Sequence, residues 1–425
     1  MRTLPLLSSR NEVRTLALIG LAALAILGLL FAVNVHVIRN VGGGGEFLVL
    51  WAGLRGIYFE QTDPYSGTVA SEVQHLVYDR PARYGEQPYI LDVPFHLLIL
   101  LSPFALIPVP DLALAAFTVL LELALLGTGI LSAELAGWRR APVAAVVFTA
   151  ALVLNPYALA ALAEASPTLL LGFAFVAIAR SLSTARFEVA GMLIVLSTFS
   201  WEVGAPVMLF FLARSIHFGR GRVWVAGAML LLVLLAISQL IYPGWYLPFL
   251  RAVVNNVRAT YGLSMADIAT HWRLPLGQQL RWVAAGLAIV LMGFEWPAVA
   301  STNPRWFAFA ACVVAAATPL LGQRLELEHL APLLFPWAVI VQSVGERWER
   351  HRPWPVLGLL AVLMGLAWWF AIRTGLVAGL ISGELMFLYL PVTTLLALYW
   401  MRWWAVRPPR TWADSLPRRG VGSRA

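Results

Sequence analysis

Long runs of apolar residues recur from one end of the chain to the other, and they restrict its fold more than any other feature. The runs are rich in Leu, Ala and Val, and short breaks that contain arginine separate them. An α-helix of about 20 such residues crosses a hydrocarbon core of ~30 Å. Of the 425 residues, 60% are hydrophobic and 12% are charged, against about 25% charged in soluble domains. The sequence therefore predicts an all-α polytopic membrane protein.

The apolar runs predict about twelve transmembrane helices. The first run is too long for the apolar part of a signal peptide and lacks a small-residue cleavage site, so we expect it to be retained as a helix. The predicted spans are residues 13–38, 111–136, 142–158, 167–181, 188–200, 203–214, 223–243, 281–299, 305–321, 329–344, 354–372 and 380–401. A further apolar stretch, residues 91–109, is interrupted by several prolines.

The positions of the arginines predict the orientation of the chain. If residues 91–109 dip into the membrane from the outer side without crossing it, all the basic loops and both termini lie on the cytoplasmic side, as the positive-inside rule requires. The net charge of +8 then reflects topology and does not indicate nucleic-acid binding. We expect a multi-pass protein of the cell membrane with one transmembrane domain over residues 1–407, a disordered basic cytoplasmic tail over residues 408–425, and any active site on the outer face.

Four consecutive glycines, residues 42–45, precede a predicted amphipathic helix in the first outer loop. Phe47, Leu50 and Leu54 recur at helical spacing, which is typical of a helix at the membrane interface. Glu46 stands at the start of this helix, near the positive end of its dipole. A carboxylate at the membrane surface suits a general base that removes a proton from a hydroxyl acceptor. A helix-capping or solvated acid is the alternative interpretation of Glu46.

Short motifs follow Glu46-Phe47 in a fixed order. They are Trp51-Ala52-Gly53, Asp63-Pro64-Tyr65 and, after a proline-interrupted stretch, Pro103-Phe104-Ala105-Leu106. This order resembles the family 87 glycosyltransferases, which are polytopic C-type enzymes that use polyprenyl-phosphate sugar donors, and the resemblance extends over residues 40–340. It implies a C-type glycosyltransferase-like bundle that transfers a sugar, with mannose as one candidate, to an acceptor hydroxyl on the outer face of the cell envelope membrane, with inversion.

The resemblance implies that Glu46, which replaces an aspartate of the family, is the catalytic base. Where relatives carry Lys-Pro, this chain has Trp201-Glu202, and Glu202 would repel a lipid phosphate. Arginine suits two-pronged contact with phosphate, although an ion pair with Glu326 or Glu328 is the alternative for Arg324. We expect donor and acceptor binding among residues of the outer segments: Arg55, Asp63, Tyr65, Glu164, Glu202, Arg258, His271, Arg324 and His329.

The expected partners are a polyprenyl-phosphate sugar donor, a lipid or glycan acceptor and membrane lipid. No metal-ligand cluster stands out in the sequence, so we predict no metal ligands. A divalent cation stays open as a cofactor, because C-type relatives use one or none. The single cysteine, Cys312, excludes an internal disulfide and a cysteine-based metal site.

Two other functions stay open. One is a non-catalytic relative that binds lipid-linked sugars. The other is a secondary transporter or flippase of such lipids, for which ionisable groups are expected at mid-membrane depth. The acids of this chain concentrate at the outer ends of the predicted helices instead, which disfavours a transporter.

Overall fold

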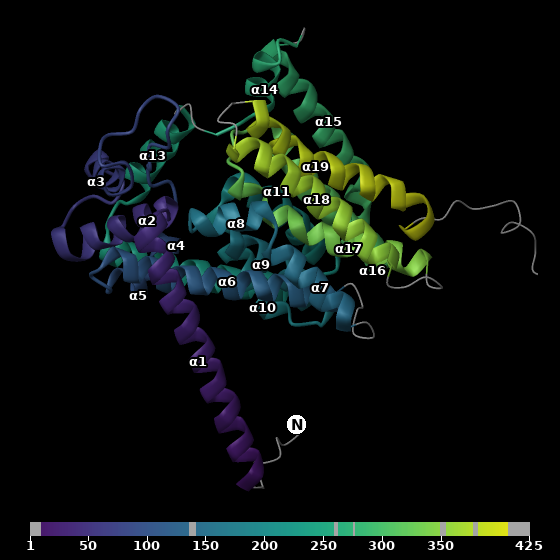
Figure 1. Ribbon diagram of the computed structural model, residues 1–425, viewed down its shortest axis with the longest axis horizontal. Coiled ribbons are helices and arrows are strands. Elements are labelled where there is room, and N and C mark those ends of the chain that lie inside the picture. The colour runs from purple at the N-terminus through teal and green to yellow at the C-terminus, as the bar shows by residue number, and fades with distance from the viewer. Residues whose placement is uncertain are drawn as a thin grey trace, which may run out of the picture.

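The computed structural model describes residues 10–135, 142–258, 262–274, 277–348, 354–376 and 381–406. Within these ranges the chain is helical, and its extended backbone pairing is limited to an isolated antiparallel bridge between Leu263 and Leu325. The predicted all-α architecture is therefore confirmed for the described residues (Figure 1). The predicted tail, residues 408–425, lies outside them.

Each of the twelve predicted spans contains at least one helix. The α-helices are α1 (Arg10–Val41), α2 (Gly45–Arg55), α3 (Gly67–Tyr78), α4 (Phe95–Leu98), α5 (Ser102–Ala105), α6 (Pro110–Leu135), α7 (Pro142–Val153), α8 (Pro156–Ala163), α9 (Thr168–Ser183), α10 (Phe187–Leu196), α11 (Trp201–His217), α12 (Gly221–Ile241), α13 (Tyr246–Arg258), α14 (Met265–His271), α15 (Leu280–Glu295), α16 (Pro304–Ala317), α17 (Phe335–Arg347), α18 (Trp354–Leu376) and α19 (Ile381–Met401). A 3₁₀ helix, Glu328–Leu334, precedes α17.

Seven helices of the described residues are long and apolar enough to cross a membrane, and α7 with α8 forms an eighth candidate. The predicted span 142–158 is not one straight helix, because α7 and α8 meet at an angle of 50°. Pro156 explains the break, since a proline disfavours helical backbone at the residue before it. Asn155 instead has extended backbone and caps α8 by accepting a hydrogen bond from the amide of Tyr157. The full count of twelve crossings stays a prediction.

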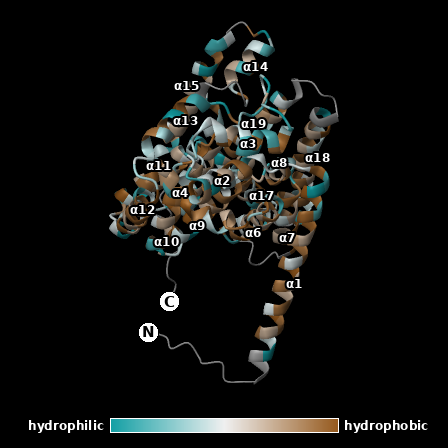
Figure 2. Ribbon diagram, turned by 90° about the vertical axis from the view of Figure 1, so that its left-hand side faces the viewer, coloured by the Kyte–Doolittle hydropathy of each residue, from teal (hydrophilic) through white to brown (hydrophobic). Residues whose placement is uncertain are grey.

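Helix α1 extends away from the bundle (Figure 1). Its leucines are exposed around the helix, with relative exposures of 51% for Leu16, 68% for Leu24 and 65% for Leu29. A continuous apolar surface of this kind on a long helix fits contact with lipid. Hydrophobic residues also predominate along α7 and α12 (Figure 2).

The bundle is built from neighbouring helix pairs. Helix α6 packs against α1, α7 and α9, whereas α10 lies between α9 and α12, and α16 packs against α15 and α19. The pair α10–α12 is especially close, because a Cβ atom on Gly191 would lie 2.1 Å from the carbonyl oxygen of Val223. Small residues allow such close approach between membrane helices.

Helix α2 lies inside the protein. All its residues from Phe47 to Leu54 are buried, and Phe47 stacks on Phe117 of α6 at 4.5 Å between ring centroids. The helix begins at the glycine run, as predicted. Its residues are buried on all sides, so it does not have the one exposed polar face expected of an amphipathic helix. A position at the membrane interface stays a prediction.

Candidate functional site

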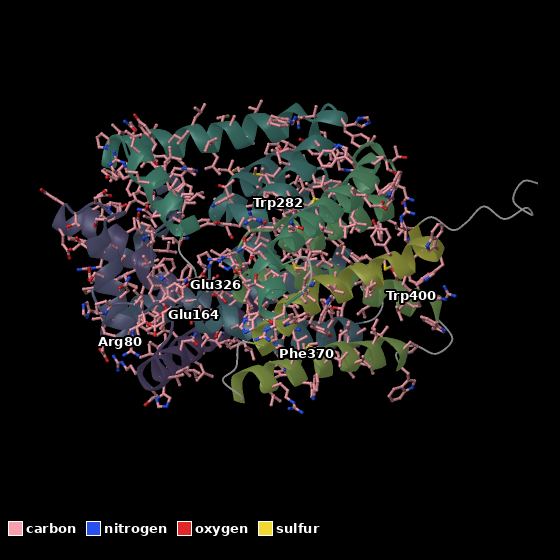
Figure 3. All side chains as sticks on the ribbon, turned by 90° about the horizontal axis from the view of Figure 1, so that it is seen from above. Arg80, Glu164, Trp282, Glu326, Phe370 and Trp400 are labelled. Atoms are coloured by element: carbon pink, nitrogen blue, oxygen red, sulfur yellow. The ribbon has the colours of Figure 1, made fainter. Side chains whose placement is uncertain are left out.

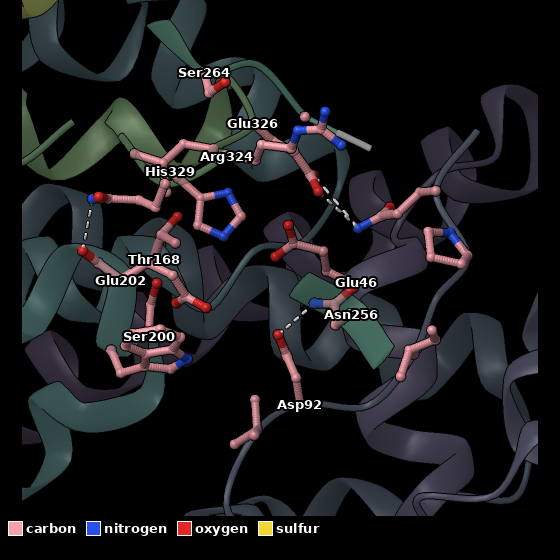
Figure 4. Close-up of a pocket in the computed structure, with 18 of the residues that line it drawn as sticks. Glu46, Asp92, Thr168, Ser200, Glu202, Asn256, Ser264, Arg324, Glu326 and His329 are labelled. Carbon is pink, nitrogen blue, oxygen red and sulfur yellow. Dashed lines mark hydrogen bonds between the residues drawn. The ribbon is translucent and has the colours of Figure 1, made fainter. Parts of the chain in front are cut away.

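A cavity of about 640 Å³ lies at the start of α2 (Figure 4). Its size is within the range of small-molecule sites in proteins. Segments far apart in the sequence line it: residues 46–50, 87–93, 167–168, 199–202, 256, 262–270, 278–281 and 322–329 supply the wall residues. Many of these side chains are polar or charged, which makes this cavity the candidate site.

The glycine run places Glu46 at the cavity. Gly44 precedes α2 with φ of +80°, in the left-handed region that glycine tolerates best. Its amide donates a hydrogen bond of 2.7 Å to the carbonyl oxygen of Ala163 at the end of α8. A Cβ atom on Gly44 would lie 2.4 Å from the side chain of Leu114. Glu46 therefore occupies the first turn of α2, as the sequence predicted.

Glu46 belongs to a group of carboxyl side chains. Burial raises the pKa of Glu46 well above its ordinary value, and the carboxylate of Glu328 raises it further. Burial also raises the pKa of Glu164 to about 7, with Glu328 again adding to the shift. The pKa of Glu326 is raised well above its ordinary value by burial and then by Glu328. Figure 3 labels Glu164 and Glu326 in a view from above.

The segment that carries Glu328 and His329 is anchored to α9. The hydroxyl of Thr168, at the start of α9, donates a hydrogen bond of 3.0 Å to the backbone carbonyl of Glu328. The 3₁₀ geometry of residues 328–334 turns the following side chain, His329, into the same cavity. These contacts bring the segment before α17 to within reach of Glu46.

Hydrogen bonds fix other acids of the cavity wall (Figure 4). The amide of Asn256 donates to Asp92 at 2.7 Å, and the amide of Gln87 donates to both oxygens of Glu326 at 3.4 Å. Glu202 lies on the opposite wall, where burial raises its pKa to about 7 and Asp92 adds to the shift. Acids from several segments of the chain thus line the cavity.

Arg324 is paired with Asp267. Its Nε and Nη2 atoms donate to the two carboxylate oxygens of Asp267 at 3.2 and 3.0 Å. Asp267 also accepts a hydrogen bond from Ser264 and closes a capping box at the start of α14. Hydrogen bonds of 2.9 and 3.0 Å between Leu263 and Leu325 hold the two segments together. The sequence suggested Glu326 or Glu328 as the ion-pair partner of Arg324. The structure shows an ion pair with Asp267.

The structure brings four predicted site residues to one cavity. Glu46, Glu202, Arg324 and His329 all line it. Glu164 is not a wall residue, but its charge acts on Glu326 from behind the wall. Its Oε2 atom is buried without a hydrogen-bond partner.

Four other predicted residues do not line this cavity. Arg55 donates to the carbonyl oxygen of Ala105, Asp63 accepts from the amide of Tyr65, and the hydroxyl of Tyr65 donates to the carbonyl oxygen of Val93. These three side chains hold together the segment between α2 and α6.

His271 pairs with Glu384, with 3.3 Å between Nδ1 and Oε1, and this joins α14 to α19. Arg258 ends α13, and its side chain lies outside the described part of the structure. His271 does not line the cavity.

Several wall residues were not among the predicted site residues. Asp92 lies in the stretch YGEQPYILDVPF, and Glu326 lies close to Arg324 in GQRLELEH. An acid in a break between apolar runs was the available signal for both. Asn256 and Asp267 carried no such signal, because both lie in polar stretches where an amide or an acid is common.

A second cavity, of about 700 Å³, lies between α6 and α7. Mostly apolar side chains line it, and they include Leu126 and Glu134 of α6. Glu134 is 20 residues beyond Leu114, the α6 residue beside Gly44, and 20 residues of helix span about 30 Å. The second cavity is therefore separate from the candidate site.

Comparison of the chain with protein-family models, with curated proteins and with solved structures found no match.

Proposed function

We propose that this protein is a membrane glycosyltransferase that moves a sugar from a polyprenyl-phosphate donor to an acceptor hydroxyl. The observation that carries the proposal is the placement of Glu46 and Arg324 on one cavity. Glu46 has a buried carboxyl oxygen, Oε1, without a hydrogen-bond partner. The guanidinium group of Arg324 is a cation suited to phosphate. The order of motifs that resembles the family 87 glycosyltransferases supplies the donor class.

In the proposed reaction Glu46 takes the proton of the acceptor hydroxyl. The acceptor oxygen then forms a bond to the anomeric carbon, and the bond between that carbon and the phosphate oxygen breaks with its electron pair on the phosphate. Burial favours this role, because a carboxylate in an apolar environment binds a proton more strongly than one in water. The leaving phosphate gains negative charge, which Arg324 is placed to stabilise.

A lipid-linked donor fits a site at the edge of a helical bundle. Its isoprenoid tail can remain among apolar helices while the sugar and phosphate enter a polar cavity. The chain offers both environments, since it has a polar cavity at the start of α2 and long apolar helices elsewhere in the bundle. The outer face of the cell membrane is the proposed side for this chemistry.

The test is release of the lipid product. Full-length protein in nanodiscs is incubated with a panel of polyprenyl-phosphate sugars and acceptor extracts, and free polyprenyl phosphate is followed. Glu46→Gln is expected to lower the rate by roughly 10²–10⁴-fold, which is typical for loss of a general base. Glu60→Gln is the matched control, because Glu60 is an exposed acid just after α2 and its loss is expected to leave the rate unchanged.

Two results would contradict the proposal. If no donor yields free polyprenyl phosphate, the protein is not a transferase for these donors. If Glu46→Gln releases polyprenyl phosphate at the wild-type rate, Glu46 is not the general base. Movement of an intact lipid-linked sugar across a proteoliposome membrane, without release of polyprenyl phosphate, would identify a flippase instead.

A further inference from the structure

Three carboxylates and one imidazole converge at the inner end of the cavity. One ligand atom from each of Glu46, Glu326, Glu328 and His329 lies within 4.8 Å of all the others. We name these four residues the acidic quartet. Atoms that bind one Mg²⁺ ion at about 2.1 Å lie at most ~4.2 Å apart, so small side-chain shifts are enough for all four to reach one ion.

Members of the acidic quartet have polar atoms that no hydrogen bond satisfies. Glu328 is only 6% exposed, and its Oε1 atom is buried without a hydrogen-bond partner in the structure. The Oε1 atom of Glu46 and the Nδ1 atom of His329 are buried without one as well. A buried carboxylate is costly unless a proton, a cationic side chain or a metal ion neutralises it.

The nearby Arg324 forms an ion pair with Asp267, which is not a member of the quartet. Arg324 directs two guanidinium nitrogens to Asp267, at 3.2 and 3.0 Å. The amide of Gln87 reaches Glu326 only at 3.4 Å. The carboxyl group of Glu164 also raises the pKa of Glu326. The quartet is therefore an acidic site whose ligand atoms lie within 4.8 Å of one another, and the ion pair between Arg324 and Asp267 lies outside it.

The charge of the cavity wall leads to the same conclusion. The described wall residues include five acids, Glu46, Asp92, Glu202, Asp267 and Glu326, and two arginines, Arg281 and Arg324. A donor phosphate would bring more negative charge into this wall. A divalent ion compensates charge on carboxylates and phosphate at once, as metal ions do in phosphate sites.

We propose that the acidic quartet binds one divalent cation of the Mg²⁺/Mn²⁺ class. Three of its four ligands are carboxylates, which suit these hard cations, and a single imidazole is compatible with Mn²⁺. A carboxylate has two oxygens, so Glu46 can bind the cation through one and leave the other for the acceptor proton. Cation binding does not depend on the proposed function, but the role of holding the donor phosphate rests on it.

Mn²⁺ binding tests the site directly. Full-length protein in detergent is treated with a chelator, freed of it, and titrated with Mn²⁺ while the electron paramagnetic resonance signal of free Mn²⁺ is recorded. We expect one bound Mn²⁺ per chain, with competition by Mg²⁺. Glu328→Gln and His329→Phe are each expected to weaken binding by at least ~10-fold, because even the loss of a residue that only orients a ligand weakens metal binding by 10–100-fold.

Glu60→Gln is the matched control, because Glu60 is an exposed acid that neither lines the cavity nor belongs to the quartet. It is expected to keep the affinity of the wild type. Circular dichroism and size-exclusion chromatography check that each variant is folded, and His329→Phe serves if Glu328→Gln does not fold. Absence of Mn²⁺ binding by the wild type up to about 1 mM, or equal affinity in all variants, overturns the proposal.

The same samples separate the cation site from the proposed function. Quartet-dependent Mn²⁺ binding without release of polyprenyl phosphate supports the cation site and counts against the transferase. Release of polyprenyl phosphate by a protein that binds no Mn²⁺ overturns the cation site and leaves the transferase standing.

Discussion

The amide of Gly44 donates a hydrogen bond to the carbonyl oxygen of Ala163 at 2.7 Å, and this bond joins the start of α2 to the end of α8. Gly44 also packs so closely on Leu114 that a Cβ atom would lie 2.4 Å from that side chain. The position of Glu46, two residues further on, depends on this contact.

Gly44→Ala is expected to destabilise the protein more than Gly42→Ala. Both glycines have positive φ, +80° and +77°, so both substitutions carry a backbone cost of about 1–2 kcal/mol. A Cβ atom on Gly42 meets no atom within 4 Å, whereas one on Gly44 meets Leu114, which adds about 1–3 kcal/mol of overpacking. Thermal unfolding in detergent measures the difference. Equal midpoints for the two variants would show that Leu114 moves aside freely.

Arg324→Gln is expected to raise the donor KM by roughly 10-fold or more, since a charged contact with phosphate is lost. The protein should stay folded, because the pair with Asp267 has side-chain exposures of 35% and 32% and such pairs contribute about 0.2–1 kcal/mol. Steady-state kinetics and the unfolding midpoint are measured together. Arg83→Gln, at an exposed arginine that does not line the cavity, is the control. An unchanged KM in Arg324→Gln would exclude a donor contact.

Stability should fall as the pH rises from about 5 to about 7. Glu202 has its pKa raised from 4.5 to about 7 in the folded protein, so the folded state binds more protons than the unfolded state in this window. The contribution of Glu202 to the free energy of unfolding is fully present below pH 4.5 and is lost as pH rises through about 7. Glu202→Gln is expected to flatten this part of the curve of unfolding midpoint against pH.

Glu86→Gln is the control for this pH profile. Hydrogen bonds from Arg80 lower the pKa of Glu86 to about 2, so its contribution is present above pH 4.5 and lost only as pH falls toward 2. Its removal should leave the slope between pH 5 and pH 7 unchanged. Because the pKa of Glu164 is also raised to about 7, part of the slope should remain in Glu202→Gln; an undiminished slope would assign the protons to Glu164 and other groups.

Glu295→Gln is expected to destabilise the protein far more than Glu134→Gln. Glu295 is fully buried and accepts hydrogen bonds from Arg402 at 2.8 Å and from Trp306 at 3.0 Å. Its loss leaves Arg402, whose side chain is only 19% exposed, without this partner, and breaking a buried ion pair costs about 3–5 kcal/mol. Glu134 and Arg180 are 33% and 29% exposed, so we expect about 1 kcal/mol there. Similar unfolding midpoints in the two variants would contradict this ranking.

The helices could be predicted from the sequence because the bilayer requires long apolar runs whose backbone groups are satisfied within one segment. The start of α2 could be predicted as well, since glycine takes the positive φ of Gly42 and Gly44 without the steric cost of a side chain. The rule for residues that precede proline explains the break before Pro156. The continuous apolar run over residues 142–158 nevertheless led to the prediction of a single span.

The composition of the site could be predicted only in part. Glu46, Glu202, Arg324 and His329 were identified because each is a polar residue in an outer break. Their partners depend on tertiary packing, as in the pair formed by Asn256 and Asp92, which are 164 positions apart. The ion pair between Arg324 and Asp267 likewise depends on the backbone bridge between Leu263 and Leu325. No local sequence pattern predicts this bridge.

The distance along the chain between Glu46 and Glu326 has a consequence for biosynthesis. The two residues are 326 − 46 = 280 positions apart, and synthesis proceeds at roughly 5–20 residues per second. Glu46 therefore leaves the ribosome tens of seconds before the residues that complete its surroundings. During that interval its carboxyl group can stay hydrated or protonated, so the site is assembled only in the last part of translation and membrane insertion.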